Sequence, residues 1–250
     1  MNSPTCKLIP IFTDNYIFAL QSNSDSATTP VIVDPGESET LIKTLSLKPG
    51  QILKILITHR HHDHIGGLKD LCQRFDCEVW GPRLSQSQIP EIHHALVGGE
   101  KIQMGDFKFE VMALPGHTWD HLAFYEKNLN WLFCGDVLFR SGCGRLFEGD
   151  FATAYASLQK IKSLPPETQI FCTHEYTLKN MEFSLHRASL LKSSQWVNEI
   201  LKQKNEVQKS RDQNLPSIPF RLEKDLSTNP FLLAQSVEEF KQLRVERDQF

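Results

Sequence analysis

One run of seven residues, Thr58-His59-Arg60-His61-His62-Asp63-His64, constrains this chain more than any other feature. Packing alone does not call for four histidines and an aspartate so close together, whereas imidazole and carboxylate suit divalent metals such as zinc, iron or manganese. The apolar residues 52–57 before the run predict a buried strand, and Gly66-Gly67 after it predicts a turn into a helix near Leu68. We therefore expect the cluster at the C-terminal end of a strand, where ligands collect in layered α/β folds.

The spacing within the cluster predicts how its side chains divide. Residues i and i+2 of an extended backbone point the same way, so His59 and His61 can face one metal. The side chain of His62 then points away from that metal. Asp63 and His64, where the chain turns, can reach a second metal.

Composition narrows the class of protein. Of the 250 residues, 40% are hydrophobic and 23% are charged, as in ordinary globular proteins. The net charge of −3, without a single-sign block, argues against a general binder of nucleic acids or membrane surfaces. No apolar run approaches the roughly 20 residues that span a bilayer, and residues 1–7 lack a secretory signal pattern. The six scattered cysteines are expected as free thiols, which favours a cytoplasmic location.

The pattern of predicted secondary structure changes near residue 175. Strands are predicted at residues 7–21 (two, around 13–15), 31–36, 52–57, 77–80, 101–114 (a hairpin), 122–125, 131–134 and 169–172. Helices are predicted at residues 37–47, 68–75 and 151–164. Beyond 175, strand signals stop and apolar residues recur at helical spacing, including a last helix over 237–247. We therefore expect a layered α/β sandwich over residues 1–174 and a smaller helical domain over 175–250.

Three later strand ends each deliver one further candidate ligand. His117 follows Pro115-Gly116, Asp136 follows Gly135, and His174 follows the strand that ends at Cys172. Taken singly, each is a weak signal, because a histidine after Pro-Gly is more often a surface or core residue. Together with the first cluster they favour a shared metal site.

These motifs resemble those of the metallo-β-lactamase superfamily, whose pattern is HxHxDH followed by single His, Asp and His ligands. More closely, the chain resembles the hydroxyacylglutathione hydrolases, the glyoxalase II family. The matching segments are residues 58–67, 114–118, 135–139, 142–149, 172–177 and 244–250. The resemblance implies a four-layer αββα metallo-β-lactamase sandwich with a C-terminal α-helical domain that covers the active site.

The resemblance also implies a ligand set. One metal would be held by His59, His61 and His117, and the other by Asp63, His64 and His174, with Asp136 bridging both. The bound ions would be two divalent metals, zinc before iron or manganese.

The activity that the resemblance implies is hydrolysis of S-(2-hydroxyacyl)glutathione, chiefly S-lactoylglutathione, to a 2-hydroxy acid (D-lactate) and glutathione. This is the second step of methylglyoxal detoxification. A hydroxide bridging the metals, with Asp63 and Asp136 as catalytic residues, would attack the thioester. Thioester chemistry suits such a site, because a thiolate whose parent thiol has a pKa near 8.5 leaves with little help from an acid.

Substrate contacts follow from the same resemblance. Arg145, Tyr176, Arg244 and Arg247 would contact glutathione, with the last two near its glycine carboxylate. The alternative for both C-terminal arginines is a solvated surface charge. The chain departs from common family residues at Phe147, where some members carry tyrosine, at Asp120, where glycine is common, and at Arg247, where lysine is frequent.

Other interpretations stay open at this point. The same site could cleave a lactone or a phosphodiester, and an iron-dependent persulfide dioxygenase shares the fold with one metal. A non-enzymatic metal protein is disfavoured by the complete ligand set. Cys143 could serve as a nucleophile, although a loop role for Gly142-Cys143-Gly144 is favoured. Asp34 is expected as a hydrogen-bond partner near the metals, and His121 as a supporting or structural residue. His93, His94 and His186 are expected on the surface. The expected partner is a small-molecule thioester, without nucleic acid or membrane, and the chain is expected to be a monomer.

Overall fold

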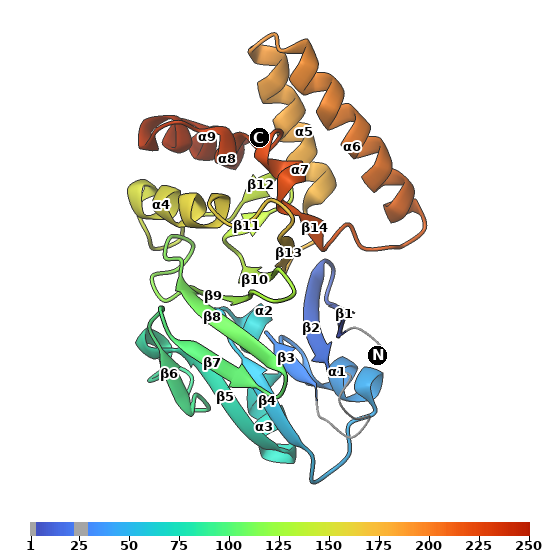
Figure 1. The fold of residues 1–250 in the computed structure, drawn as a ribbon, viewed down its shortest axis with the longest axis vertical. Helices are drawn as coiled ribbons and strands as arrows, with labels where there is room; N and C mark the ends of the chain where they lie inside the picture. Colours follow the sequence, from blue (N-terminus) through green and yellow to red (C-terminus); the bar gives the residue numbers. More distant parts are fainter. Residues whose placement is uncertain (1–3, 23–29) are drawn as a thin grey trace. The chain divides into compact units, whose positions relative to one another are not determined.

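The computed structural model describes residues 4–22 and 30–250, which form two compact units (Figure 1). Unit 1 comprises Met1–Ala113 and Asp120–Leu129, and unit 2 comprises Leu114–Trp119 and Asn130–Phe250. Residues 1–3, part of the segment in which no secretory signal is expected, lie outside the described ranges. The units are defined by packing, so the domain boundary between residues 174 and 175 stays a prediction.

Unit 1 is built on a six-stranded mixed sheet in the order β1-β2-β3-β4-β5-β6. Its strands are β1 (Thr5–Ile11), β2 (Asn15–Gln21), β3 (Val31–Val33), β4 (Ile52–Leu56), β5 (Asp76–Pro82) and β6 (His94–Leu96). The first three pair antiparallel, and β3 to β6 pair parallel. Parallel pairing sets Val33 opposite Leu56, so β3 and β4 end side by side. The residues that follow these two strands are therefore neighbours.

Helices cover this sheet with apolar side chains. They are α1 (Ser38–Leu45), the single turn α2 (His62–Ile65), α3 (Leu68–Arg74) and the 3-10 turn η1 (Arg83–Ser85). Glu37 caps α1 by accepting hydrogen bonds from the backbone amides of Glu39 and Thr40. Leu41 of α1 and Leu71 of α3 are fully buried in a core with Ile32 and Ile55 of the sheet. Burial of this apolar surface stabilises the strand that carries the histidine cluster.

An antiparallel meander completes unit 1. Its strands are β7 (Lys101–Met104), β8 (Phe107–Ala113) and β9 (Leu122–Glu126). Phe107, Phe109 and Val111 are buried and alternate with more exposed residues, which confirms the hairpin predicted from their spacing.

Unit 2 contains a short mixed sheet and a small hairpin. The strand β10 (Trp131–Gly135) pairs parallel with β13 (Gln169–Cys172), which pairs antiparallel with β14 (Phe220–Arg221). The hairpin consists of β11 (Leu138–Phe139) and β12 (Gly142–Cys143). Gly135 lies opposite Cys172, so the residues that follow β10 and β13 emerge at the same sheet edge.

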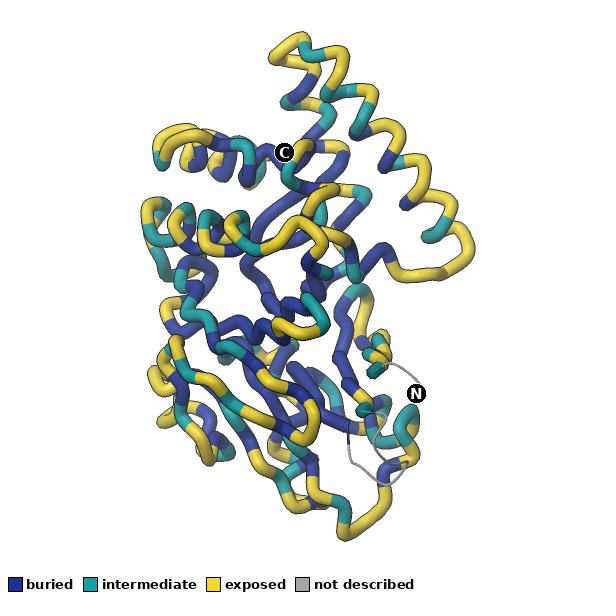
Figure 2. Tube along the Cα trace, in the orientation of Figure 1, coloured by how far each residue is buried: buried dark blue, intermediate teal, exposed yellow. Residues whose placement is uncertain are grey.

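Helices make up most of unit 2 (Figure 1). They are α4 (Phe151–Lys162), α5 (Thr177–Leu190), α6 (Ser194–Asp212), α7 (Leu222–Leu226), α8 (Pro230–Leu233) and α9 (Val237–Gln249). The long helices α5 and α6 pack together through Met181, Ala188, Ile200 and Val207. Much of α6 remains exposed (Figure 2). The prediction that the chain beyond residue 175 is mainly helical is confirmed.

The prediction that strands stop at residue 175 is wrong at one point. The two residues of β14 pair with β13, with Phe220 opposite Ile170. A strand of two residues is too short to show an alternating pattern, and its partner strand is distant in the sequence. The strands β6, β11 and β12 were not predicted because they too are only two or three residues long.

Candidate metal centre

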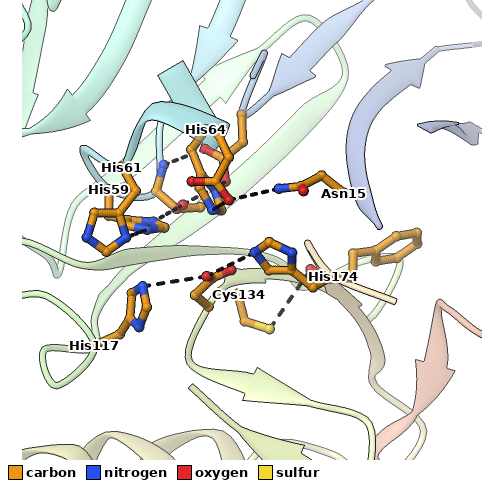
Figure 3. A network of polar contacts seen from close by, with 12 residues as sticks. Asn15, His59, His61, His64, His117, Cys134 and His174 are labelled. Carbon is orange, nitrogen blue, oxygen red and sulfur yellow. Dashed lines mark hydrogen bonds and ion pairs between the residues drawn. The ribbon is translucent and has the colours of Figure 1, made fainter. Parts of the chain in front are cut away.

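In unit 1, the end of β4 delivers two histidines to one place. His59 Nε2 lies 3.0 Å from His61 Nδ1, so the i, i+2 spacing does turn both side chains the same way (Figure 3). His59 is fully buried and His61 is half-buried. His62 is exposed, in agreement with the prediction that it points away.

Asp34, at the end of neighbouring β3, orients this segment. Its carboxylate accepts hydrogen bonds from the Thr58 backbone amide (2.8 Å) and hydroxyl (2.6 Å). The same carboxylate lies 2.8 Å from His64 Nδ1. A proton on Nδ1 leaves the lone pair of the ring on Nε2, the atom that would bind a metal. The expected role of Asp34 as a hydrogen-bond partner is confirmed.

Asp63 is placed by the short helix α2. Asn15 Nδ2 donates to Asp63 Oδ2 at 2.9 Å, and the same oxygen lies 3.7 Å from His64 Nε2 (Figure 3). Asn15 was not predicted as a site residue, because a turn-forming asparagine far upstream carries no signal of this contact. Unit 1 therefore gathers four donor residues, His59, His61, Asp63 and His64.

Unit 2 gathers the other three predicted ligands around Asp136. Asp136 Oδ2 lies 3.5 Å from His117 Nε2 and 3.2 Å from His174 Nε2 (Figure 3). All three side chains are buried. The opposite nitrogen of His117, Nδ1, lies 2.7 Å from the carbonyl oxygen of Arg145, which fixes the ring with Nε2 toward the carboxylate.

Close backbone packing requires glycine beside Asp136. A Cβ atom at Gly144 would lie 1.8 Å from the Asp136 carbonyl oxygen, a hard clash with backbone. Gly142 and Cys143 belong to β12, so the favoured loop interpretation of this segment is corrected to a short hairpin strand. The role in backbone geometry remains.

Two buried cysteines of unit 2, Cys143 and Cys172, are not activated as nucleophiles. Cys143 and Cys172 are buried, and burial raises the pKa of both thiols. A thiol in that state holds little thiolate at neutral pH.

The donors fit divalent transition metals. Within each unit, imidazole nitrogens and carboxylate oxygens meet at short distances in buried surroundings. Such groups are costly to bury without a compensating charge, and a bound cation supplies one. Histidine and aspartate donors of this kind suit zinc, iron and manganese.

The four residues predicted to contact glutathione all lie in unit 2. They differ in exposure and in the groups that they contact. Arg145 is exposed, and Tyr176 stacks on the His174 ring at 4.6 Å between centroids. Arg244 is buried and donates to the carbonyl oxygen of Cys143 at 2.9 Å. Arg247 is half-buried and donates to Asn180 Oδ1 at 3.3 Å.

The carboxylate of Asp248 links two of these arginines. Its Oδ1 accepts from Arg145 Nε at 3.3 Å and from Arg244 Nη2 at 2.8 Å. Sequence reasoning missed Asp248, although its spacing of four residues from Arg244 on a helix was a usable signal. Burial, and then the neighbouring Arg244 cation, lower the pKa of Arg247. Cations crowded in this way favour an anionic ligand.

The chain is similar to known proteins over nearly its whole length. Residues 25–174 match the family model of the metallo-beta-lactamase superfamily, and residues 175–250 match that of the hydroxyacylglutathione hydrolase C-terminus. The hydroxyacylglutathione hydrolase of Bdellovibrio bacteriovorus is 44% identical over 247 residues, covering 97% of this chain and 96% of that protein. The hydroxyacylglutathione hydrolase of Vibrio campbellii is 42% identical over 234 residues, covering 93% and 87%.

A solved structure supports the fold. ETHE1 from Myxococcus xanthus aligns with a TM-score of 0.68 at 22% identity, covering 96% of this chain and 90% of that one. The predicted fold class, a metallo-β-lactamase α/β fold with a C-terminal helical region, is confirmed. Within the part of the chain that the structure describes, no helix has the length and apolar character to cross a membrane.

Proposed function

The chain belongs to the hydroxyacylglutathione hydrolase family within the metallo-β-lactamase superfamily, and from this membership we propose that it hydrolyses S-(2-hydroxyacyl)glutathione. The products would be a 2-hydroxy acid and glutathione, and S-lactoylglutathione is the first substrate to test. The observation that carries the proposal is the identity of 44% to a hydroxyacylglutathione hydrolase over 97% of the chain. The donor clusters of both units support the same chemistry.

We propose that the seven donors hold two divalent metal ions. His59, His61 and His117 would bind one ion, Asp63, His64 and His174 would bind the other, and Asp136 would bridge them. A carboxylate suits the bridging role because each oxygen can bind one ion. Zinc as the resident metal, a monomeric state and a cytoplasmic location stay predictions.

The protein's own groups would position the reaction. Bound divalent ions would supply a nucleophile derived from water at neutral pH and would polarise the thioester carbonyl. Asp34 holds His64 with Nε2 available for a ligand bond, and the Arg145 carbonyl does the same for His117. Asn15 fixes Asp63 through Oδ2. Asp63 and Asp136 would act as the catalytic carboxylates.

We propose that residues 175–250 provide most of the glutathione site, in keeping with their match to the family's C-terminal model. Tyr176, Arg244 and Arg247 belong to this region, and Arg145 reaches it through Asp248. Guanidinium groups pair well with the carboxylates of glutathione. Because Arg244 is buried, whereas Arg145 is exposed and Arg247 half-buried, Arg145 and Arg247 are the better candidates for direct contact.

A thioester assay together with elemental analysis tests the proposal. The purified protein should release glutathione from S-lactoylglutathione and contain about two metal ions per chain. Asp136→Ala should lose metal and more than about 100-fold in kcat/KM, beyond the loss expected for an outer-shell partner. The matched control His62→Ala removes an exposed histidine of the same motif and should leave both unchanged.

Two outcomes would overturn the assignment. Turnover of lactones or phosphodiesters with S-lactoylglutathione left intact would indicate another hydrolase. A single iron per chain with oxygen uptake would indicate a dioxygenase.

A further inference from the structure

A partly buried ion pair lies directly beside the histidine cluster of unit 1. Arg60, between His59 and His61, donates from Nη1 to Asp120 Oδ1 at 3.3 Å. The Asp120 side chain is 1% exposed and that of Arg60 is 27% exposed. Ser85, buried in η1, donates its hydroxyl to the other carboxylate oxygen of Asp120. Both oxygens of Asp120 are therefore engaged.

The segment around Asp120 contacts the cluster at two more points. The ring of His121 stacks on that of His59, with centroids 4.7 Å apart and planes inclined by 22°. The Leu122 amide, at the start of β9, donates to the Thr58 carbonyl oxygen at 2.8 Å. Main chain, ring and ion pair thus connect residues 120–122 with residues 58–60 one after another.

Because Arg60 lies between the two histidines, its ion pair influences the orientation of both side chains. In extended backbone, the side chain of residue 60 points opposite to those of residues 59 and 61. Fixing the direction of Arg60 therefore fixes the rotation of the backbone that aims His59 and His61. The pairing also neutralises an arginine that would otherwise repel a cation nearby.

We propose that Asp120 and Arg60 are positioning residues that aim His59 and His61 for metal binding, an inference that rests on the proposed metal-dependent function. Neither residue is a ligand. Their contribution is to hold the ligand-bearing strand end in one orientation before the ion arrives, which raises affinity because less ordering remains to be done on binding.

Metal affinity, measured without substrate, tests the proposal. Asp120→Asn and Arg60→Gln should each weaken zinc binding by about 10- to 100-fold in a chelator competition, as for other outer-shell partners. The double variant should lose no more than the weaker-binding single, because the two residues act as one unit. Arg60→Lys keeps the charge and should recover most of the affinity. The matched control Arg74→Gln breaks an exposed ion pair of the same unit and should bind zinc normally.

The absorption spectrum of the cobalt(II)-substituted protein provides a second readout, because it reports coordination geometry. It should change in Asp120→Asn and Arg60→Gln and be normal in Arg74→Gln. Variants that only melt at a lower temperature, with normal zinc affinity and a normal cobalt spectrum, would overturn the proposal. So would additive losses in the double variant. Should Asp120→Asn fail to fold, Arg60→Gln and Arg60→Lys decide the matter by the same measurements.

The proposed function can fail separately. If the wild-type chain binds two metals but leaves S-lactoylglutathione intact, the proposed substrate is wrong. The comparison of metal affinities among the variants still decides the role of Asp120 and Arg60.

Discussion

At the scale of single residues, Asp225 shows how unit 2 holds its hairpin through one buried carboxylate. Asp225 Oδ2 accepts hydrogen bonds from the Ser141 amide at 2.7 Å and from Asn229 Nδ2 at 2.8 Å. Asn229 in turn donates to the carbonyl oxygen of Gly142 at 3.0 Å. Burial raises the pKa of Asp225 to about 6, against the lowering effects of Asn229, Ser141 and Arg140. The hairpin next to Asp136 is therefore tied to a group that titrates near neutral pH.

This carboxyl should make stability depend on pH. Its pKa in the folded chain exceeds the ordinary value of 3.8, so the folded state binds the proton more tightly. The resulting stabilisation is complete below about pH 4 and is lost as the pH rises through about 6, a change of roughly 3 kcal/mol. The difference in unfolding free energy between wild type and Asp225→Asn, from urea melts at pH 4.5 to 7.5, should follow this curve. Parallel curves for the two proteins would contradict it.

At the scale of elements, α9 presents three of its charged residues on one face. Arg244, Arg247 and Asp248 stand at i, i+3 and i+4, so they share a face of the helix. Asp248 binds Arg244 on the same helix and Arg145 from the loop after β12. The set leaves more positive than negative charge on this face, which suits a ligand with carboxylates.

Removing one cation from this face should weaken substrate binding. Arg247→Gln is expected to raise KM for S-lactoylglutathione by about 10-fold or more, the effect of losing one hydrogen bond to a charged group. The value of kcat should stay within about 2-fold, since the contact is distant from the reacting carbonyl and is shared by ground and transition states. Steady-state kinetics measures both. Arg221→Gln, an exposed arginine of the same unit, is the control and should change neither. A fall in kcat at constant KM would contradict this role for Arg247.

Which elements could be predicted depended on the range of their interactions. β4 is a mostly apolar run and the longer helices carry a helical period, so these elements were predictable from local sequence. His117, Asp136 and His174 were predictable as candidate ligands because each follows a strand and a turn signal. β11, β12 and β14 are two residues long and exist only through partners. Strands of this length are too short to show an alternating pattern in the sequence.

At the scale of the whole molecule, the supporting contacts were harder to predict than the ligands. Asn15 and Asp63 are 48 residues apart, and Arg60 and Asp120 are 60 apart. Arg145 and Asp248 are separated by 103 residues. Each pair forms because the fold brings distant segments together. The chemistry of the candidate site could therefore be predicted from motifs, whereas the network that orients it required the structure.

Metal binding is expected to contribute to the stability of the entire chain. Buried donors such as His59, His64 and Asp136 lose hydration on folding, and a bound cation would offset that cost for the Asp136 carboxylate. An ion that binds only the folded state, at about 1,000 times its Kd, stabilises by roughly 4 kcal/mol per site. For a chain of this length, that corresponds to a melting temperature about 10 °C higher.

Chelation of both proposed ions should therefore lower the melting temperature of the wild type by about 20 °C, and added zinc should restore it. Differential scanning fluorimetry of the metal-free and zinc-loaded protein measures the difference. His62→Ala should respond like the wild type, because His62 is exposed and outside the ligand set. Asp136→Ala should melt near the metal-free wild type and gain little from zinc, since its bridging carboxylate is gone. Equal melting temperatures for loaded and metal-free wild type would mean that the buried donors are satisfied within the protein itself.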